Sequence, residues 1–192
     1  MALLKDETGV GILGAGGIAA LSHLPEIAEV KGLRVVHIAG RKERRLKLLQ
    51  ERFAVPRAST TWAEVLEDPA VNAVVVSLPH PLHAEAILMA LDAGKHVLAT
   101  KPLCVTMADA NRIVTACETH PDLTVFIRPD AAPEIREMRR QVEGGSIGRI
   151  TGAQAHYAHG GPEIYYGQVA EFFGEDVPDD LWFFDAAQAE VG

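Results

Sequence analysis

Residues 10–19 read Val10-Gly11-Ile12-Leu13-Gly14-Ala15-Gly16-Gly17-Ile18-Ala19, and this stretch decides the fold. Its apolar first part predicts a buried strand that runs straight into the spacing Gly14-x-Gly16-x-x-Ala19. In such a loop the first glycine makes a tight turn, the second lets a pyrophosphate approach the backbone, and the third small residue packs helix against strand. The helix that follows directs unpaired N–H groups at a phosphate. We therefore interpret the stretch as the phosphate loop of a dinucleotide-binding unit. A plain turn between strand and helix and a methyltransferase-type nucleotide site are the alternatives.

Strand-like and helix-like patterns alternate from this loop to residue 143. Further strands are expected at 33–39, 71–78, 96–99 and 123–127, and helices at 17–30, 41–53, 61–67, 81–93, 106–119 and 133–143. The first helix should be interrupted between Ser22 and Pro25, because proline suits the first turn of a helix better than its middle. The alternation predicts an α/β fold with a doubly wound parallel sheet of the Rossmann type.

The pattern changes after Gly148. Residues 150–158 could form a long strand, whereas residues 159–192 are rich in glycine and aromatic side chains without a clear period. We therefore expect a dinucleotide-binding Rossmann domain over residues 1–128. Residues 129–192 then hold a bridging helix and the start of a second α/β domain, which serves the substrate or oligomerisation.

This second part has few periodic segments from which to build a core of its own. Trp182, Phe183 and Phe184 should pack on the first domain, pair with another subunit or remain disordered. We therefore expect the chain to form a homo-oligomer, to bind a partner or to show a disordered tail. In isolation it should lack dehydrogenase activity.

Composition excludes several other classes of protein. The formal net charge of −8 argues against a nucleic-acid binder, which needs a basic face. No apolar run is long enough to span a membrane, and Met1–Glu7 lacks the apolar core of a signal peptide. Two cysteines make neither a disulfide framework nor a zinc site, so a reducing, cytoplasmic setting is expected. His156-x-x-His159 lacks further ligands, so no metal is expected.

The residues after the second expected strand bear on the choice of cofactor. Dinucleotide folds that prefer NAD usually carry an acid about 20 residues beyond the glycine loop, where it holds the ribose hydroxyls. Here that position is Gly40, followed by Arg41 and Lys42. These cations suit a 2′-phosphate, so NADP is favoured over NAD. A solvated basic first turn of a helix is the alternative.

Two later motifs carry a family resemblance. The chain reads Ser77-Leu78-Pro79-His80-Pro81-Leu82-His83-Ala84-Glu85, and then Ala93-Gly94-Lys95-His96-Val97 followed by Lys101-Pro102-Leu103. With the glycine loop, these motifs resemble the Gfo/Idh/MocA oxidoreductases over residues 8–155. The resemblance implies a Rossmann domain followed by an open-sheet α/β domain. It also implies hydride transfer between NAD or NADP and a sugar, polyol or related carbonyl compound.

The same resemblance suggests roles for single residues. Lys101 would be the family's catalytic lysine at the carboxyl end of a strand, where its ammonium could polarise a substrate oxygen. The Lys101–Pro102 bond is expected to be cis. A plain exposed lysine in a strand–helix loop is the alternative. A non-catalytic dinucleotide-binding module, or a relic of such an enzyme, is the alternative for the whole chain.

Several positions depart from the family pattern or have two interpretations. Thr100 stands where the family has Glu, so Lys101 loses a carboxylate that would favour its charged form. His80 stands where the family often has Asn, although its ring could still bond the nicotinamide ribose. His83 matches the family's His but could equally be a partly buried helix residue. Arg128 could contact cofactor or substrate, or lie in solvent. The family's Asp-x-x-x-His motif has no match before Gly192.

The complete prediction names one catalytic residue, Lys101. The predicted cofactor-binding residues are Gly14, Ala15, Gly16, Gly17, Ile18, Ala19, Gly40, Arg41, Lys42, Ser77, Leu78, Pro79, His80, His83, Thr100, Lys101, Pro102 and Arg128.

Overall fold

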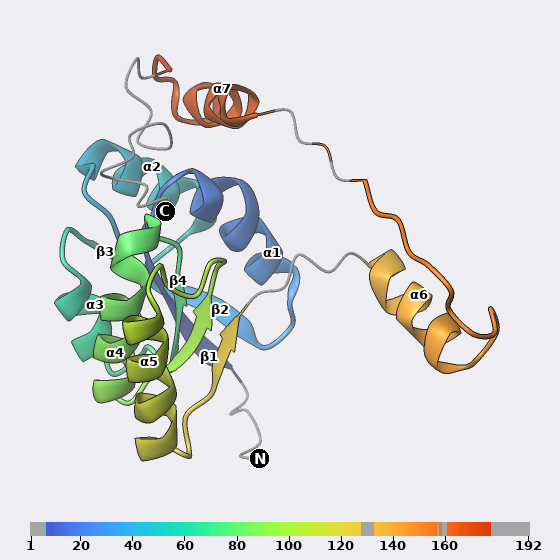
Figure 1. Ribbon diagram of the computed structural model, residues 1–192. Helices are drawn as coiled ribbons and strands as arrows, with labels where there is room; N and C mark the ends of the chain where they lie inside the picture. Colours follow the sequence, from blue (N-terminus) through green and yellow to red (C-terminus); the bar gives the residue numbers. More distant parts are fainter. Residues whose placement is uncertain (1–6, 128–132, 157, 159–160, 178–192) are drawn as a thin grey trace.

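A six-stranded parallel sheet forms the centre of the molecule in the computed structural model, which describes residues 7–127, 133–156, 158 and 161–177. The strands are β1 Thr8–Leu13, β2 Leu33–Ala39, β3 Arg57–Ser59, β4 Ala73–Val76, β5 His96–Ala99 and β6 Val125–Ile127. They lie in the order β3-β2-β1-β4-β5-β6, and each neighbouring pair is parallel (Figure 1). The order reverses between β1 and β4, as in the Rossmann fold. The predicted doubly wound sheet is confirmed.

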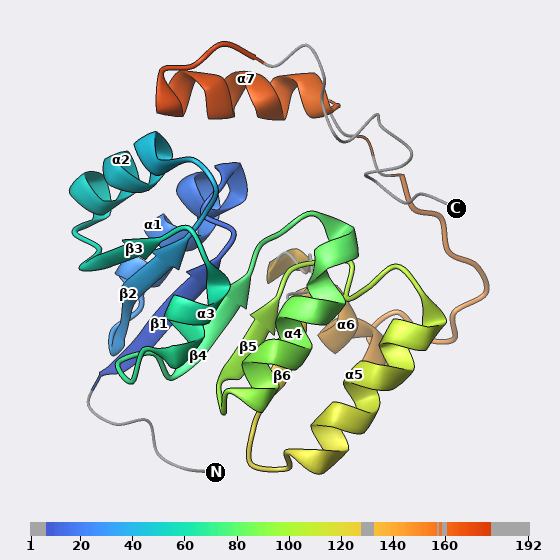
Figure 2. The same cartoon turned by 90° about the vertical axis from the view of Figure 1, so that its left-hand side faces the viewer.

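Helices cover both faces of this sheet (Figure 2). They are η1 Ala19–His23, α1 Leu24–Glu29, α2 Glu43–Phe53, α3 Trp62–Glu67, η2 His80–Leu82, α4 His83–Asp92, α5 Met107–Thr119, α6 Pro133–Glu143 and α7 Pro162–Phe173. One apolar core joins the sheet to α3, α4 and α5. The other joins it to η1, α1, α2 and α7. Two layers of helices thus bury all of β1 and all of β4 except the half-buried Ala73, which explains why both strands consist mostly of apolar residues.

The predicted interruption of the first helix is a π-helical turn. In η1 the N–H of Leu24 donates to the carbonyl of Ala19, five residues back, and α1 then begins with Pro25 in its first turn. Proline has no N–H and its ring clashes with the carbonyl four residues earlier, so a regular α-helix cannot continue through it. The widened turn leaves Pro25 in the first turn of α1, where a missing N–H costs no helical hydrogen bond.

Two expectations for the later part of the chain were wrong. Residues 150–156 and 158 form no strand, and Ile150 is 55% exposed. An alternating pattern makes a strand only where a sheet edge can pair with it. In contrast, residues 162–173, where no period was apparent, form α7. The short edge strand β3 was also missed, because three residues carry too little pattern.

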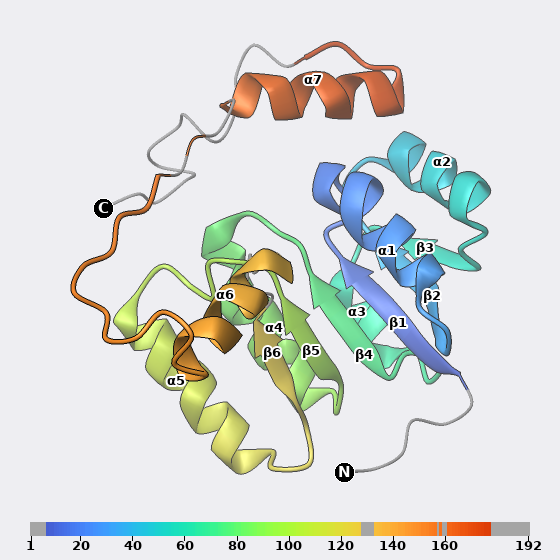
Figure 3. The ribbon, with the colours of Figure 1, turned by 90° about the vertical axis from the view of Figure 1, so that its right-hand side faces the viewer.

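Helix α7 lies across the first part of the molecule, close to α2 and to the helix formed by η1 and α1 (Figures 2 and 3). Val169 and Phe173 are buried against these helices, at 4% and 1% exposure. A segment far along the chain therefore covers the region that follows β1 and β2. Among the described residues, no helix is long and apolar enough to cross a membrane.

Candidate cofactor site

Three loops meet at the carboxyl edge of the sheet, after β1, β4 and β5. Backbone bonds hold them together: the N–H of Ser77 donates to Leu13 O at 2.8 Å, and the N–H of Thr100 donates to Val76 O at 3.1 Å. The predicted segments 14–19, 77–83 and 100–102 therefore lie side by side. This crevice is the topological switch point, where open α/β sheets bind their ligands.

The glycine loop has the geometry that its sequence predicts. Gly14 has a φ of +99°, and a Cβ there would lie 2.1 Å from Ser77 O, so only glycine fits this turn. The N–H groups of Gly14 and Ala15 both donate to Ala39 O, which ties the loop to β2. A Cβ on Gly16 would meet no atom within 4 Å. The backbone at Gly16 is thus open to an approaching ligand, as a pyrophosphate requires.

The next two loop residues contact α7, which the sequence did not predict. A Cβ on Gly17 would lie 2.4 Å from both the Tyr165 hydroxyl and Val169 Cγ2. The N–H of Ile18 donates to the hydroxyl oxygen of Tyr165, and burial raises the pKa of this hydroxyl to about 12. Ala19 is fully buried below the loop. The tyrosine therefore occupies one of the helix N-terminal donors that a phosphate would use.

The residues after β2 form a basic surface at the start of α2. Gly40 packs tightly against the glycine loop, because a Cβ there would lie 3.3 Å from the Cβ of Ala15. Arg41 and Lys42 are both exposed. The Lys42 ammonium lies 3.4 Å from a carboxylate oxygen of Glu175, just beyond α7.

Glu175, like Tyr165, lies at the candidate site although the sequence analysis did not place it there. Its carboxylate accepts from Arg45 through both Nε and Nη2, and lies 3.4 Å from Nη1 of Arg44. Hydrogen bonds from Arg45 lower the pKa of the Glu175 carboxyl to about 2. Burial opposes this shift, and the charges of Arg45 and Lys42 add to it. An acid therefore does stand near the end of β2, but it comes from another part of the chain.

His83 holds two of the loops in place. The residue is fully buried at the start of α4, with Nδ1 2.7 Å from Pro102 O and Nε2 2.9 Å from Leu78 O. Since a ring nitrogen bonds a carbonyl only as an N–H donor, the neutral ring donates one of these bonds and the protonated ring donates both. The geometry favours a positioning role for His83 between the β4 and β5 loops.

Lys101 is exposed at the end of β5, and its bond to Pro102 is cis, as the family resemblance implied. Partial burial, followed by the charges of His83 and Lys101, lowers the pKa of the half-buried His80. His80 is therefore near Lys101 and neutral at pH 7, able to donate or accept a hydrogen bond. The Thr100 hydroxyl donates to Val76 O at 3.1 Å and joins β5 to β4. Thr100 strengthens the strand end but brings Lys101 no negative charge.

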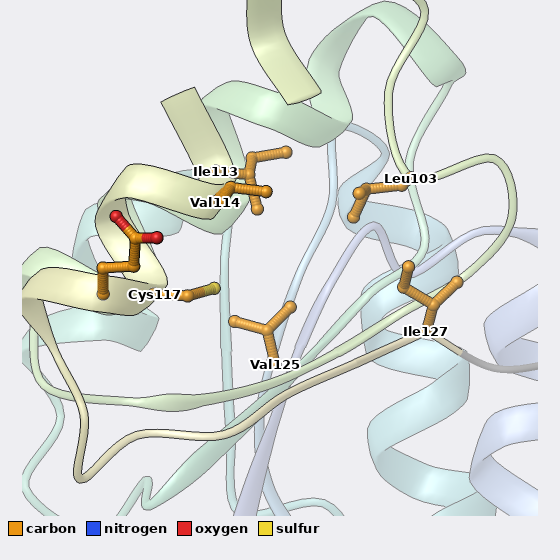
Figure 4. Close-up of a pocket in the computed structure, with 7 residues that line it drawn as sticks. Leu103, Ile113, Val114, Cys117, Val125 and Ile127 are labelled. Carbon is orange, nitrogen blue, oxygen red and sulfur yellow. The ribbon is translucent and has the colours of Figure 1, made fainter. Parts of the chain in front are cut away.

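An apolar hollow of about 360 Å³ lies elsewhere, between α5 and β6 (Figure 4). Leu103, Ile113, Val125 and Ile127 line it, with Cys117 at one side. It holds little that could bind a phosphate or a polar substrate, so we place the candidate site at the three loops.

Among the described residues, no three His, Cys, Asp or Glu side chains gather as metal ligands would. Arg128 and the Trp182–Phe184 cluster lie outside the described residues.

Comparison with known proteins identifies the family. A model of the Gfo/Idh/MocA oxidoreductases, described as having an NAD-binding Rossmann fold, matches residues 8–127. The chain belongs to this family. It is 32% identical over 150 residues to an uncharacterized oxidoreductase of Rhizobium meliloti, covering 78% of this chain and 45% of that protein. It is 31% identical over 153 residues to trans-1,2-dihydrobenzene-1,2-diol dehydrogenase of Mus musculus, covering 77% and 45%.

Solved structures of Gfo/Idh/MocA-like enzymes resemble the same part of the chain. A 3-ketoreductase from Actinomadura kijaniata, in complex with NADP and TDP-benzene, is 33% identical with a TM-score of 0.65, covering 72% of this chain and 43% of that one. A scyllo-inositol dehydrogenase from Lactobacillus casei has a TM-score of 0.72 at 21% identity, covering 78% and 45%, which shows the fold alone. This family member thus spans less than half the length of these relatives.

Proposed function

We propose that the chain is the cofactor-binding part of an NAD(P)-dependent oxidoreductase that acts on a sugar, a polyol or a related carbonyl compound. The observation that carries this proposal is the glycine loop at the switch point, open at Gly16 and adjacent to the strand end that bears Lys101. The names of the relatives support it, since they include a deoxysugar 3-reductase, a diol dehydrogenase and a myo-inositol dehydrogenase.

The residues of the three loops have separable tasks in this proposal. The Gly14–Ala19 loop would hold the pyrophosphate through its backbone, and the Ser77–His80 loop would lie along the nicotinamide half of the cofactor. A nicotinamide dinucleotide supplies hydride transfer when bound. Lys101 would hydrogen-bond the substrate oxygen and stabilise the negative charge that develops there. His80, being neutral, would position the ribose or the substrate through a hydrogen bond.

Two free thiols, Cys104 and Cys117, support the proposed cytoplasmic setting.

NADP is the proposed preferred cofactor. Arg41 and Lys42 are exposed at the position that reads the 2′ group of the ribose. Exposed ion pairs contribute up to about 1 kcal/mol, so Arg41→Ala should weaken NADP binding roughly fivefold and leave NAD binding unchanged. Calorimetric titration with both cofactors measures this difference. Equal losses for NAD and NADP would show that Arg41 does not read the 2′-phosphate.

The decisive experiment replaces Gly16 with leucine. The protein has open space at the Gly16 Cβ, so the variant should fold normally while its side chain blocks the pyrophosphate. Gly152→Leu is the matched control, because its Cβ also meets no atom within 4 Å and it lies outside the three loops. We expect Gly16→Leu to lose binding of both dinucleotides and the control to retain it. Unchanged calorimetric affinity in Gly16→Leu would refute the site.

Catalysis is tested separately at Lys101. In whichever longer or assembled form turns over a sugar or polyol, Lys101→Met should lower kcat strongly while the affinity for the cofactor stays near that of the wild type. A wild-type kcat would refute the role of Lys101. The alternative, a dinucleotide-binding module without catalysis, is favoured by one feature, the uncharged Thr100 beside Lys101. That alternative predicts cofactor binding without turnover in every form of the protein.

A further inference from the structure

The segment after α7 returns to the start of α2 and fixes a carboxylate there. Gly174 ends α7 in the left-handed conformation, with a φ of +59°, and so turns the chain back. The N–H of Glu175 then donates to Ala170 O at 2.9 Å. Arg44 donates to Gly174 O at 3.1 Å. The peptide group between Gly174 and Glu175 is thus bound through both its N–H and its carbonyl, independently of the Glu175 side chain.

Helix α7 itself is anchored along its length. The Phe173 ring is buried beneath the Arg45 guanidinium, 4.4 Å away, and the Phe172 ring lies 4.3 Å from the Arg52 guanidinium. At the other end of α7, Tyr165 contacts the glycine loop. Glu175 is therefore held in a defined place relative to the phosphate loop. Its side chain is only 16% exposed.

The cations around Glu175 include a residue that was predicted to bind the cofactor. Arg45 is as buried as its partner, whereas the side chains of Lys42 and Arg44 are 60% and 65% exposed. Arg45 therefore serves mainly to fix the carboxylate. Lys42 and Arg44 are accessible to a ligand, but each lies 3.4 Å from the carboxylate. A phosphate on the ribose would compete with this fixed negative charge for both cations and would be repelled by it.

We propose that Glu175 is a specificity-determining residue of the cofactor site: its carboxylate restrains Lys42 and Arg44 and holds the affinity for NADP down relative to NAD. The inference rests on the proposed dinucleotide site. Gly40 stands where NAD-preferring folds usually carry an acid. The proposal assigns the effect of that acid to Glu175, which lies 130 positions beyond Arg45 in the sequence. In this arrangement Arg41 favours the 2′-phosphate and Glu175 opposes it, so the ratio of the two affinities reflects both residues.

The test replaces Glu175 with glutamine and measures NAD and NADP binding by calorimetry at neutral pH. Glutamine keeps an oxygen for Arg45 but removes the charge, so α7 should stay docked through Phe173. We expect NADP to bind roughly threefold to tenfold more tightly, since two exposed ion pairs are released, and NAD to bind as before. Glu175→Asp keeps the charge and should keep the wild-type ratio. Glu171→Gln, an exposed acid one turn earlier on α7, makes the same change in net charge and should leave the ratio unchanged.

Each outcome is decisive. A wild-type ratio in Glu175→Gln, a shift that Glu171→Gln reproduces, or weaker NADP binding would overturn the inference alone. Loss of NAD binding in Glu175→Gln would show that the residue only supports the fold of the site. A wild-type protein that binds neither dinucleotide would instead contradict the proposed function, and the inference with it. Titration with 2′,5′-ADP and 5′-AMP repeats the comparison without the nicotinamide half of the cofactor. Glu175→Gln should bind 2′,5′-ADP more tightly than the wild type does, and 5′-AMP as the wild type does.

Discussion

Single residues in the glycine loop were predictable because their roles depend only on local geometry. The positive φ of Gly14 and the open space at Gly16 both follow from the spacing of small residues after a buried strand. Tyr165 and Glu175 were not predictable in the same way. Their contacts with Ile18 and Lys42 exist only because α7 docks on helices that are more than a hundred residues earlier in the chain. A tyrosine or glutamate in a segment without a clear period carries no such signal.

Tyr165→Phe should strengthen the binding of NAD and NADP alike. The Tyr165 hydroxyl accepts the N–H of Ile18, and this donor belongs to the helix terminus that would hold the pyrophosphate. A hydrogen bond contributes about 1 kcal/mol net, so freeing the donor should raise both affinities up to about fivefold. Calorimetry with both cofactors measures the change, with the adjacent Tyr166→Phe as the control. Weaker binding of both would instead mean that the hydroxyl takes part in holding the phosphate.

At the scale of elements, the best predictions came from helices with strong end signals. Helix α5 begins after Thr106, whose hydroxyl accepts the N–H of Asp109 at 3.0 Å, and it ends at Thr119 as expected. The bounds of α6 were also predicted correctly. Helix α7 was missed because apolar residues lie around most of its circumference, so no single stripe stands out. The predicted strand at 150–158 failed because the described part of this segment pairs with neither edge strand of the sheet.

The docking of α7 should weaken in acid through Glu175. Its pKa is about 2 in the folded chain, where Arg45 bonds it, and near the ordinary 4.5 when the segment is released. A lowered pKa means that the contribution of Glu175 is complete above about pH 4.5 and is lost as the pH falls towards 2. Hydrogen exchange of the α7 amides, compared at each pH with Glu175→Gln, measures it. We expect the wild type to be better protected above pH 4.5 and the two proteins to converge near pH 2.

A second carboxylate with a lowered pKa, Asp68, makes the comparison with Glu175→Gln at each pH necessary. Burial raises the pKa of its carboxyl, but the N–H of Ala70, His37 and Arg57 together lower it more, so Asp68 also destabilises the chain when protonated. This effect is the same in the wild type and in Glu175→Gln. A constant difference in α7 protection across the whole range would show that Glu175 does not hold the helix through its charge.

For the whole molecule, the Rossmann sheet was predictable and the remainder of the chain was only partly so. Alternating buried strands and amphipathic helices leave few topologies for residues 8–127, and the six strands adopt one of these, the doubly wound parallel sheet. After β6 the described residues pack unevenly: α7 joins the core, whereas α6 has exposed side chains from residue 135 to 143 except for the half-buried Val142. Figure 1 shows α6 standing apart from the sheet. How the sequence divides into domains therefore stays a prediction.

The exposed apolar side chains beyond β5 lead to the prediction that the chain associates with itself. Phe126 and Ile127 on the edge strand β6 are 54% and 41% exposed, and Ile135 and Met138 on one face of α6 are 48% and 57% exposed. Open strand edges and apolar stripes of this kind usually become interfaces. Full burial of an exposed apolar side chain contributes about 1.5–3 kcal/mol, and each of these, being about half exposed, would contribute about half of that. Four such side chains on each protomer therefore favour association, opposed by the loss of translational and rotational freedom.

Light scattering of the wild type and of a Met138→Glu, Ile135→Glu double variant tests this association. We expect the wild type to have at least twice the mass of the chain and the double variant to be a monomer, because a charge on the α6 face cannot be buried without a partner. Met107→Glu is the control, since Met107 is 76% exposed at the start of α5, outside this surface, and should leave the mass unchanged. Both variants should bind the cofactor normally, because their substitutions lie outside the glycine loop and the start of α2. A wild-type chain that stays monomeric at the same concentration would contradict the prediction and leave the α6 face to a different partner.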